Sequence, residues 1–218
     1  MRIPLLLAVA CLMSCRAAPD ASTKAGDSSV VAGASATEQE RLVAGGEAVR
    51  RQGDTLVLHL RAGGDVRLAN DTAGSDNWLL YEFDRHLDRA PFYGVRLQFF
   101  EGQGYLLVHD STGRQTRVDA QPVVSPDGHR VATASMDLVA AFDPTRLFVG
   151  AIVGDTMQTE FELEPTDWGP DSLAWSGADT VRFVQRWVTA EPGAYRDVRA
   201  KLVRSRSGWQ LTPADTSH

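Results

Sequence analysis

The fold class is decided by residues 105–132, which read YLLVHDSTGRQTRVDAQPVVSPDGHRVA. Apolar runs of strand length alternate here with clusters of turn-forming residues. In the turn from Ser125 to Gly128, proline presets φ, aspartate caps its own backbone, and glycine accepts a positive φ. This pattern predicts short antiparallel strands joined by tight turns.

The same pattern extends along most of the chain. Four further pairs of β-like runs are each separated by turn residues, and they predict hairpins at 55–68, 95–108, 147–163 and 198–211. No stretch shows a long apolar period of 3.6, so the domain is expected to be all-β. Strands opening at Val95, Leu147 and Val198 are spaced by 52 and 51 residues, which indicates an internal repeat.

Residues 105–132 resemble the repeat of bacterial propellers related to the periplasmic Tol-system propeller and to tryptophan–aspartate-repeat proteins. In that repeat, two outer strands lead to an inner strand that ends in Ser-Pro-Asp-Gly, as residues 125–128 do here. Leu173–Phe183 reads as a degenerate copy, and residues 54–70 as a half-unit. The resemblance implies a propeller-like array of about three and a half four-stranded blades. A four-bladed ring, an open array, a closed antiparallel β-barrel and a sandwich remain alternatives.

The N-terminus has the layout of a secretory signal, because Arg2 precedes about a dozen apolar residues. Its end, Leu12-Met13-Ser14-Cys15, resembles the bacterial lipobox. That resemblance implies cleavage before Cys15, acylation of this cysteine and stable anchoring in the membrane by several acyl chains. Arg16 follows, and the absence of aspartate at this position favours the outer membrane, with the protein facing the periplasm.

The domain boundaries follow from changes in composition. Residues 1–14 are the expected signal peptide, and residues 15–51 the lipidated cysteine with a flexible tether that is rich in Ala, Gly, Ser and Thr. Within the tether, residues 36–43 could form a short helical turn that Gly45-Gly46 would end. Residues 52–213 are the expected all-β domain, and residues 214–218 a disordered tail.

Charge and cysteine content limit the possible partners. The net charge of −6 argues against nucleic acid, because phosphate binding needs a cationic surface. The two cysteines, Cys11 and Cys15, both lie in the leader, so the domain has no disulfide or thiolate metal site. None of the five histidines has a metal-ligand spacing, and no nucleotide-binding fingerprint occurs, so neither metal nor cofactor is expected.

Three residues are candidates for binding. His86 and Arg89 belong to the densest polar cluster, Phe83–Arg89, at the start of the longest expected loop, Asp84–Gly94. Alternating charges in this cluster are equally typical of a solvated loop. Trp168, beside Gly169-Pro170, is the best candidate for an exposed aromatic ring, although tryptophan in a small β domain often serves core packing.

A basic run near the C-terminus comprises Arg196, Arg199, Lys201, Arg204 and Arg206. Strand alternation would separate Arg196 from Arg199 and Lys201. The run is typical of an edge strand protected by charge, and it could also contact an anionic lipid or an acidic partner.

The function expected from the sequence is that of a non-enzymatic, membrane-anchored lipoprotein, which acts as a protein-interaction module in the cell envelope. A small β-barrel that binds an apolar or saccharide ligand is the alternative, and an envelope hydrolase is the third. A propeller predicts four-stranded units, a barrel predicts continuous pairing, and an enzyme predicts a cleft where His86 meets a second titratable group.

Overall fold

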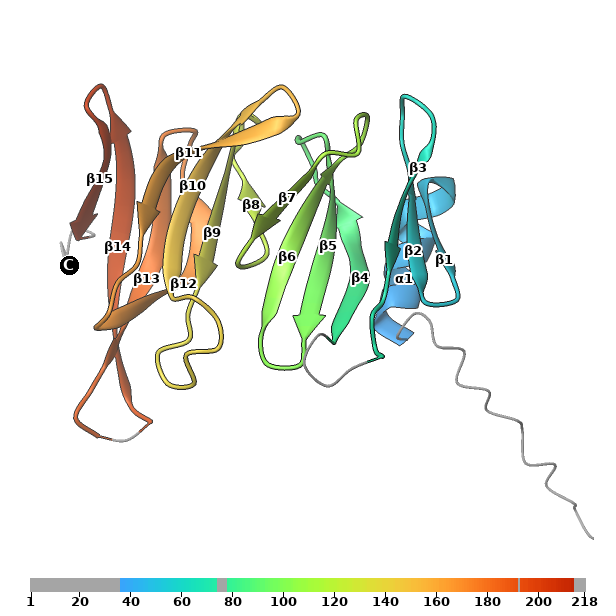
Figure 1. Ribbon diagram of the computed structural model, residues 1–218. Helices are drawn as coiled ribbons and strands as arrows, with labels where there is room; N and C mark the ends of the chain where they lie inside the picture. The colour runs from blue at the N-terminus through green and yellow to red at the C-terminus, as the bar shows by residue number, and fades with distance from the viewer. Residues whose placement is uncertain (1–35, 74–77, 192, 214–218) are drawn as a thin grey trace, which may run out of the picture. The chain divides into compact units, whose positions relative to one another are not determined.

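The computed structural model describes residues 36–73, 78–191 and 193–213. These residues form one α-helix, a short 3-10 turn and four separate antiparallel sheets (Figure 1). The all-β prediction is confirmed. None of the four sheets closes into a barrel, so the barrel alternative is wrong.

The elements follow one another in simple order. Helix α1 spans Ala36–Gly45, and the 3-10 turn η1 spans Gly46–Ala48. The first sheet contains β1 (Val49–Gln52), β2 (Thr55–His59) and β3 (Asp65–Ala69). The second contains β4 (Leu79–His86), β5 (Phe92–Phe99), β6 (Gln103–His109) and β7 (Gln115–Val118). The third contains β8 (Val123–Val124), β9 (Arg130–Ser135), β10 (Arg146–Val153) and β11 (Thr156–Leu163). The fourth contains β12 (Trp168–Trp175), β13 (Thr180–Val188), β14 (Tyr195–Ser205) and β15 (Gly208–Pro213).

The repeat is real, but its period is shorter than the sequence spacing suggested. The three four-stranded sheets are meanders whose first strands open at Leu79, Val123 and Trp168, 44 and 45 residues apart. Val95 lies in the second strand of its sheet, whereas Leu147 and Val198 lie in third strands. The interval of 52 residues therefore compared strands that are not equivalent, whereas the interval of 51 compared two third strands, β10 and β14, which begin 49 residues apart.

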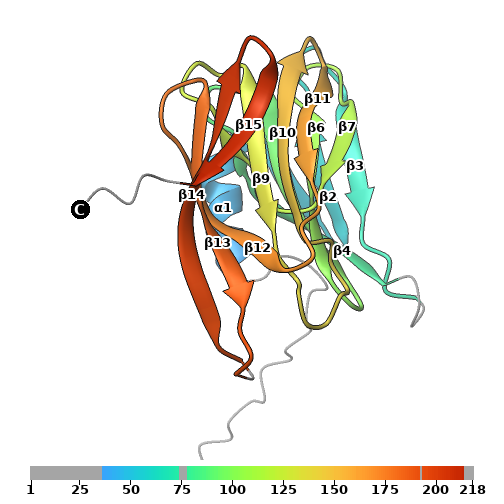
Figure 2. The same ribbon diagram turned by 90° about the vertical axis from the view of Figure 1, so that its left-hand side faces the viewer.

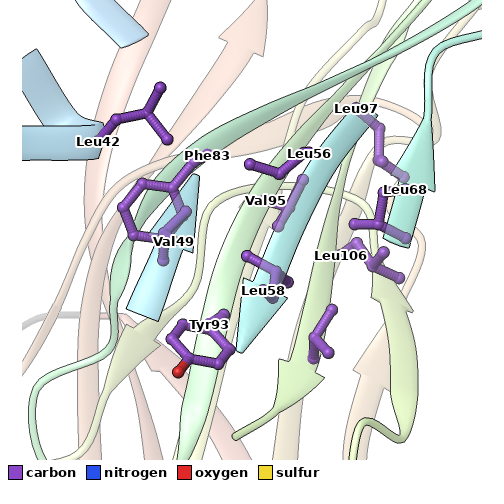
Figure 3. Packing of buried hydrophobic residues seen from close by; sticks show 11 residues of the cluster. Leu42, Val49, Leu56, Leu58, Leu68, Phe83, Tyr93, Val95, Leu97 and Leu106 are labelled. Carbon is purple, nitrogen blue, oxygen red and sulfur yellow. The ribbon is translucent and has the colours of Figure 1, made fainter. Parts of the chain in front are cut away.

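Successive sheets pack through three apolar cores. The first core joins α1 and the first sheet to the second sheet, with Leu42, Leu56 and Leu58 packed near Phe83 and Val95 (Figure 3). The second core lies between the second and third sheets, and the third core between the third and fourth. Strand β5 contributes to two cores, which explains its nearly continuous apolar sequence.

Both ends of the array present polar faces. On the outer face of the first sheet, Arg50 and His59 bind Asp65, and Arg67 donates to Gln52. The outer face of the fourth sheet, in front in Figure 2, carries charged residues from β12, β13 and β14. These are Asp171, Arg182, Arg186, Asp197, Arg199 and Lys201. Polar outer faces are what the terminal units of a stacked repeat need.

The basic run does not protect an edge. Strand β14 lies between β13 and β15, so the expected edge position is wrong. The predicted separation within the run is confirmed, because Arg199 and Lys201 lie on the outer face and Arg196 lies over the Trp187 ring on the other face.

The fold begins before the expected boundary at residue 52. The short helix expected near residues 36–43 is present as α1 and buries Leu42 and Glu38, while Val49 of β1 joins the first core. Helix α1 needs only a few widely spaced apolar residues to pack against the sheets, because an ion pair between Glu38 and Arg51 also holds it in place. Cys15 and the expected signal, the first part of the tether and the C-terminal tail lie outside the described residues.

Gly128 ends the turn that starts at Ser125, and both its backbone conformation and a close neighbour constrain it. Gly128 has a φ of 76°, and a Cβ added to it would lie 2.4 Å from the carbonyl oxygen of Arg89. Gly177 has a similar φ of 81° but open space around it. Gly128 therefore meets two constraints, and Gly177 only one.

We expect Gly128→Ala to lower the free energy of unfolding by about 1–3 kcal/mol more than Gly177→Ala does. Both variants suffer the same backbone strain of roughly 1 kcal/mol, and only Gly128→Ala also meets the Arg89 carbonyl. Urea denaturation of both variants measures the difference. Equal losses of unfolding free energy in the two variants would show that the backbone at Arg89 moves aside at no energetic cost.

Candidate functional site

His86 lies at a pocket of about 540 Å³ between α1, the first sheet and the edge of the second. Its floor is apolar and includes Phe83, Val49 and Ala48. Its rim is lined by Arg61, Arg85, His59, His86 and Asp88. This hollow, which we call the His86 pocket, joins segments far apart in the sequence.

A buried carboxylate holds two rim groups in place. Asp110, with no exposed surface, lies 2.9 Å from Nε2 of His86 and 3.1 Å from Nε of Arg61. The Ser111 hydroxyl donates to the other carboxylate oxygen. Burial alone would raise the pKa of Asp110, but hydrogen bonds from His86 and Ser111 and the charge of Arg61 outweigh it and lower that pKa. Asp110 is therefore a carboxylate at neutral pH.

A β-bulge in β4 brings four consecutive residues to the pocket. The register between β4 and β5 shifts between Phe83 and Arg85. Strict alternation would send neighbouring side chains to opposite faces, yet residues 83–86 all line the pocket. Asp84, at the bulge, is buried and accepts hydrogen bonds from Arg85 and from more distant residues, namely Arg96, Tyr105 and Gln121. The bulge thus anchors the strand where it forms the pocket wall.

His59 also lines the pocket, although its side chain lies on the outer face of the first sheet. Its Nδ1 lies 2.9 Å from Asp65, and its backbone oxygen accepts a hydrogen bond from the Tyr93 hydroxyl at 2.7 Å. The hydrogen bond from His59, with the charge of Arg50, lowers the pKa of Asp65 although burial opposes the shift. Each histidine of the pocket is therefore backed by its own carboxylate.

Arg89 belongs to a neighbouring hollow. It has a φ of 67° and lines a pocket of about 470 Å³ with Leu87 and residues 122–124. Arg85 and Asp88 line both hollows. The long loop expected at 84–94 is wrong, because β4 continues to His86 and β5 starts at Phe92, which leaves only five residues between them.

Trp168 is buried, so the expected exposed ring is wrong. Only 8% of its surface is accessible, and it stacks on Phe183 with ring centroids 6.0 Å apart. Trp168 opens β12 opposite Trp187 and belongs to the core between the third and fourth sheets. The adjacent Gly169 is packed against Met136, which keeps this segment close to its neighbour.

A second surface, made of exposed apolar side chains, was not predicted from the sequence. Phe100, in the turn after β5, is 69% exposed, while Val139 and Phe142, in the loop after β9, are 82% and 57% exposed. Asp143 links the two segments by accepting a hydrogen bond of 2.9 Å from the Gln103 backbone. Both segments lie at the same, lower end of Figure 1. We call these three side chains the loop-end patch; their separation in sequence hid it.

Within residues 36–73, 78–191 and 193–213, no cluster of three or more His, Cys, Asp or Glu side chains could hold a metal ion. No helix in this part of the chain is long and apolar enough to cross a bilayer.

No protein-family model matches the sequence, and a search of curated proteins found no match. The site is therefore interpreted from its own geometry.

Proposed function

We propose that the chain is a non-enzymatic lipoprotein of the bacterial outer membrane, which faces the periplasm and binds protein partners in the cell envelope. The folded part would be a row of propeller-type blades, in agreement with its four-stranded meanders and their period of 44–45 residues. The lipobox-like sequence that ends at Cys15 supports the anchor.

The observation that carries the interaction role is the loop-end patch. Three large apolar side chains from two loops in contact are more than half exposed, while three cores bury the apolar faces of the sheets. Grouped apolar side chains on the surface of a soluble domain mark interaction sites, and aromatic residues are enriched in the centres of interfaces.

Site-specific photo-crosslinking in intact envelopes tests this role. A photoreactive residue at Phe142 is expected to capture a defined partner, and the same residue at Arg67, on the polar outer face of the first sheet, is not. Replacing Phe100 and Val139 with serine should abolish capture from position 142. Capture of the same proteins from both positions, or of none from position 142, contradicts the proposal.

The anchor has its own test. Metabolic labelling with a palmitate analogue is expected to label the wild-type protein and to be lost in Cys15→Ala, because that cysteine supplies the acylated sulfur. Cys11→Ala is the matched control and should retain the label. An unlabelled wild type, or full labelling of Cys15→Ala, would exclude the lipid anchor.

A hydrolase is the second candidate, favoured by the contact between His86 and Asp110. A carboxylate that orients an imidazole is the usual support of a general base. The hydroxyl beside this pair, on Ser111, donates to Asp110 and so does not serve His86 as a nucleophile. Ester or amide turnover that disappears in His86→Gln would establish this candidate over a binding role.

A further inference from the structure

We propose that the His86 pocket binds a small molecule that carries an oxyanion, either a carboxylate or a phosphate, on a compact apolar body. This inference concerns the folded domain alone. It rests neither on the membrane anchor nor on the partner of the loop-end patch.

The first argument is the set of donors at the rim. Arg61 uses Nε to reach Asp110, and Arg85 uses Nε to reach Asp84. The terminal nitrogens of Arg61 have no partner among the described residues, whereas the Arg85 guanidinium also forms a hydrogen bond with the Tyr105 side chain. His86 uses Nε2 on Asp110, which leaves its Nδ1 without a described partner. Guanidinium groups with free terminal nitrogens suit the geometry of carboxylate and phosphate oxygens.

The second argument is that carboxylates hold these groups in position. Asp110 binds Arg61 and His86, Asp84 binds Arg85, and both carboxylates are buried. A cationic side chain that a carboxylate already holds in place loses less conformational entropy when it binds a ligand. The buried acids also reduce the net positive charge, so affinity depends on directed hydrogen bonds more than on bulk attraction.

The third argument is the apolar floor. Phe83 and Val49 belong to the first core, and Ala44 and Ala48 add small side chains beside them. A volume of about 540 Å³ lies within the range of roughly 300–1,000 Å³ that is common for small-molecule sites. A ring or a short aliphatic chain can cover this floor while its oxyanion meets the rim. Exposed Asp88 also lines the pocket and would oppose an anion.

Calorimetry of the purified full-length protein with phenyl phosphate, benzoate, inorganic phosphate and phenol tests the inference. We expect phenyl phosphate or benzoate to bind more tightly than inorganic phosphate, and phenol not to bind. The comparison of phenyl phosphate with benzoate shows which oxyanion is preferred. Amide shifts in the wild-type protein should centre on Ala48, Arg61 and His86, which requires no variant.

Three substitutions sharpen the test. Arg61→Gln should weaken binding about tenfold or more, because it removes a charged hydrogen-bond donor. Arg67→Gln removes an exposed arginine of the first sheet outside the pocket and should leave affinity unchanged. Asp88→Asn should strengthen binding.

Three results would overturn the inference. They are no saturable binding of either aromatic anion at millimolar concentration, shifts that centre elsewhere, and equal weakening by Arg67→Gln and Arg61→Gln. The last result would indicate non-specific attraction. Photo-crosslinking at Phe142 and labelling at Cys15 are independent of all three, so their outcome separates this inference from the proposed function.

Discussion

Replacing Glu38 with alanine is expected to lower the free energy of unfolding by about 3–5 kcal/mol, because a buried ion pair loses one partner. The Glu38 carboxylate has no exposed surface, accepts a hydrogen bond of 2.7 Å from the Phe83 backbone, and pairs with Arg51. Arg51 also donates to the backbone oxygen of Tyr81. One carboxylate therefore connects α1, β1 and β4.

Chemical denaturation of Glu38→Ala measures this loss, and Glu40→Ala in the same helix is the matched control. Glu40 is exposed, so its removal should cost less than about 0.5 kcal/mol. A double variant, Glu38→Leu with Arg51→Met, should recover part of the loss, since no charge then remains buried without its partner. If Glu38→Ala lowers the free energy of unfolding no more than Glu40→Ala does, α1 is not part of the cooperative fold.

Strand content and hairpins could be predicted from the sequence because their causes are local. Alternating apolar residues favour strands, and glycine at a positive φ, as at Gly154 and Gly128, favours tight turns. The hairpins predicted near Val95 and Leu147 pair as expected. The helix at residues 36–45 was visible as a local pattern as well, but its packing was not.

The candidate site depended on contacts that no local pattern encodes. His86 was selected for its charged neighbours, whereas its partners Arg61 and Asp110 lie in other segments of the chain. The bulge at Asp84 changes the strand alternation beside the pocket, and Asp84 is held there by a buried hydrogen bond from a distant strand. Trp168 was misplaced for the same reason, because the neighbouring glycine and proline suggested a loop, while pairing with β13 makes that segment a strand.

Gly94→Ala is expected to lower the free energy of unfolding by about 3–5 kcal/mol, because it causes steric overlap and breaks a buried hydrogen bond. A Cβ on Gly94 would lie 2.0 Å from the Tyr105 hydroxyl oxygen, which is closer than any non-bonded contact allows. Tyr105 has little room to move, since its ring is buried and its hydroxyl donates to Asp84 at 2.7 Å. Burial and the neighbouring Asp84 carboxylate raise the pKa of Tyr105, so it remains a neutral donor at physiological pH.

Gly104→Ala is the matched control for this substitution, because it lies in the adjacent strand of the same sheet. The nearest atom to a Cβ on Gly104 is 3.5 Å away, an ordinary contact, so the change should stay within about 1 kcal/mol. Tyr105→Phe removes the atom that overlaps most, and it should therefore cost less in a Gly94→Ala background than in the wild type. Thermal and urea denaturation of the four proteins of this cycle measure the coupling. Additive losses would mean that the second sheet relieves the overlap by moving its backbone, and that the bulge at Asp84 is less rigid than its hydrogen bonds imply.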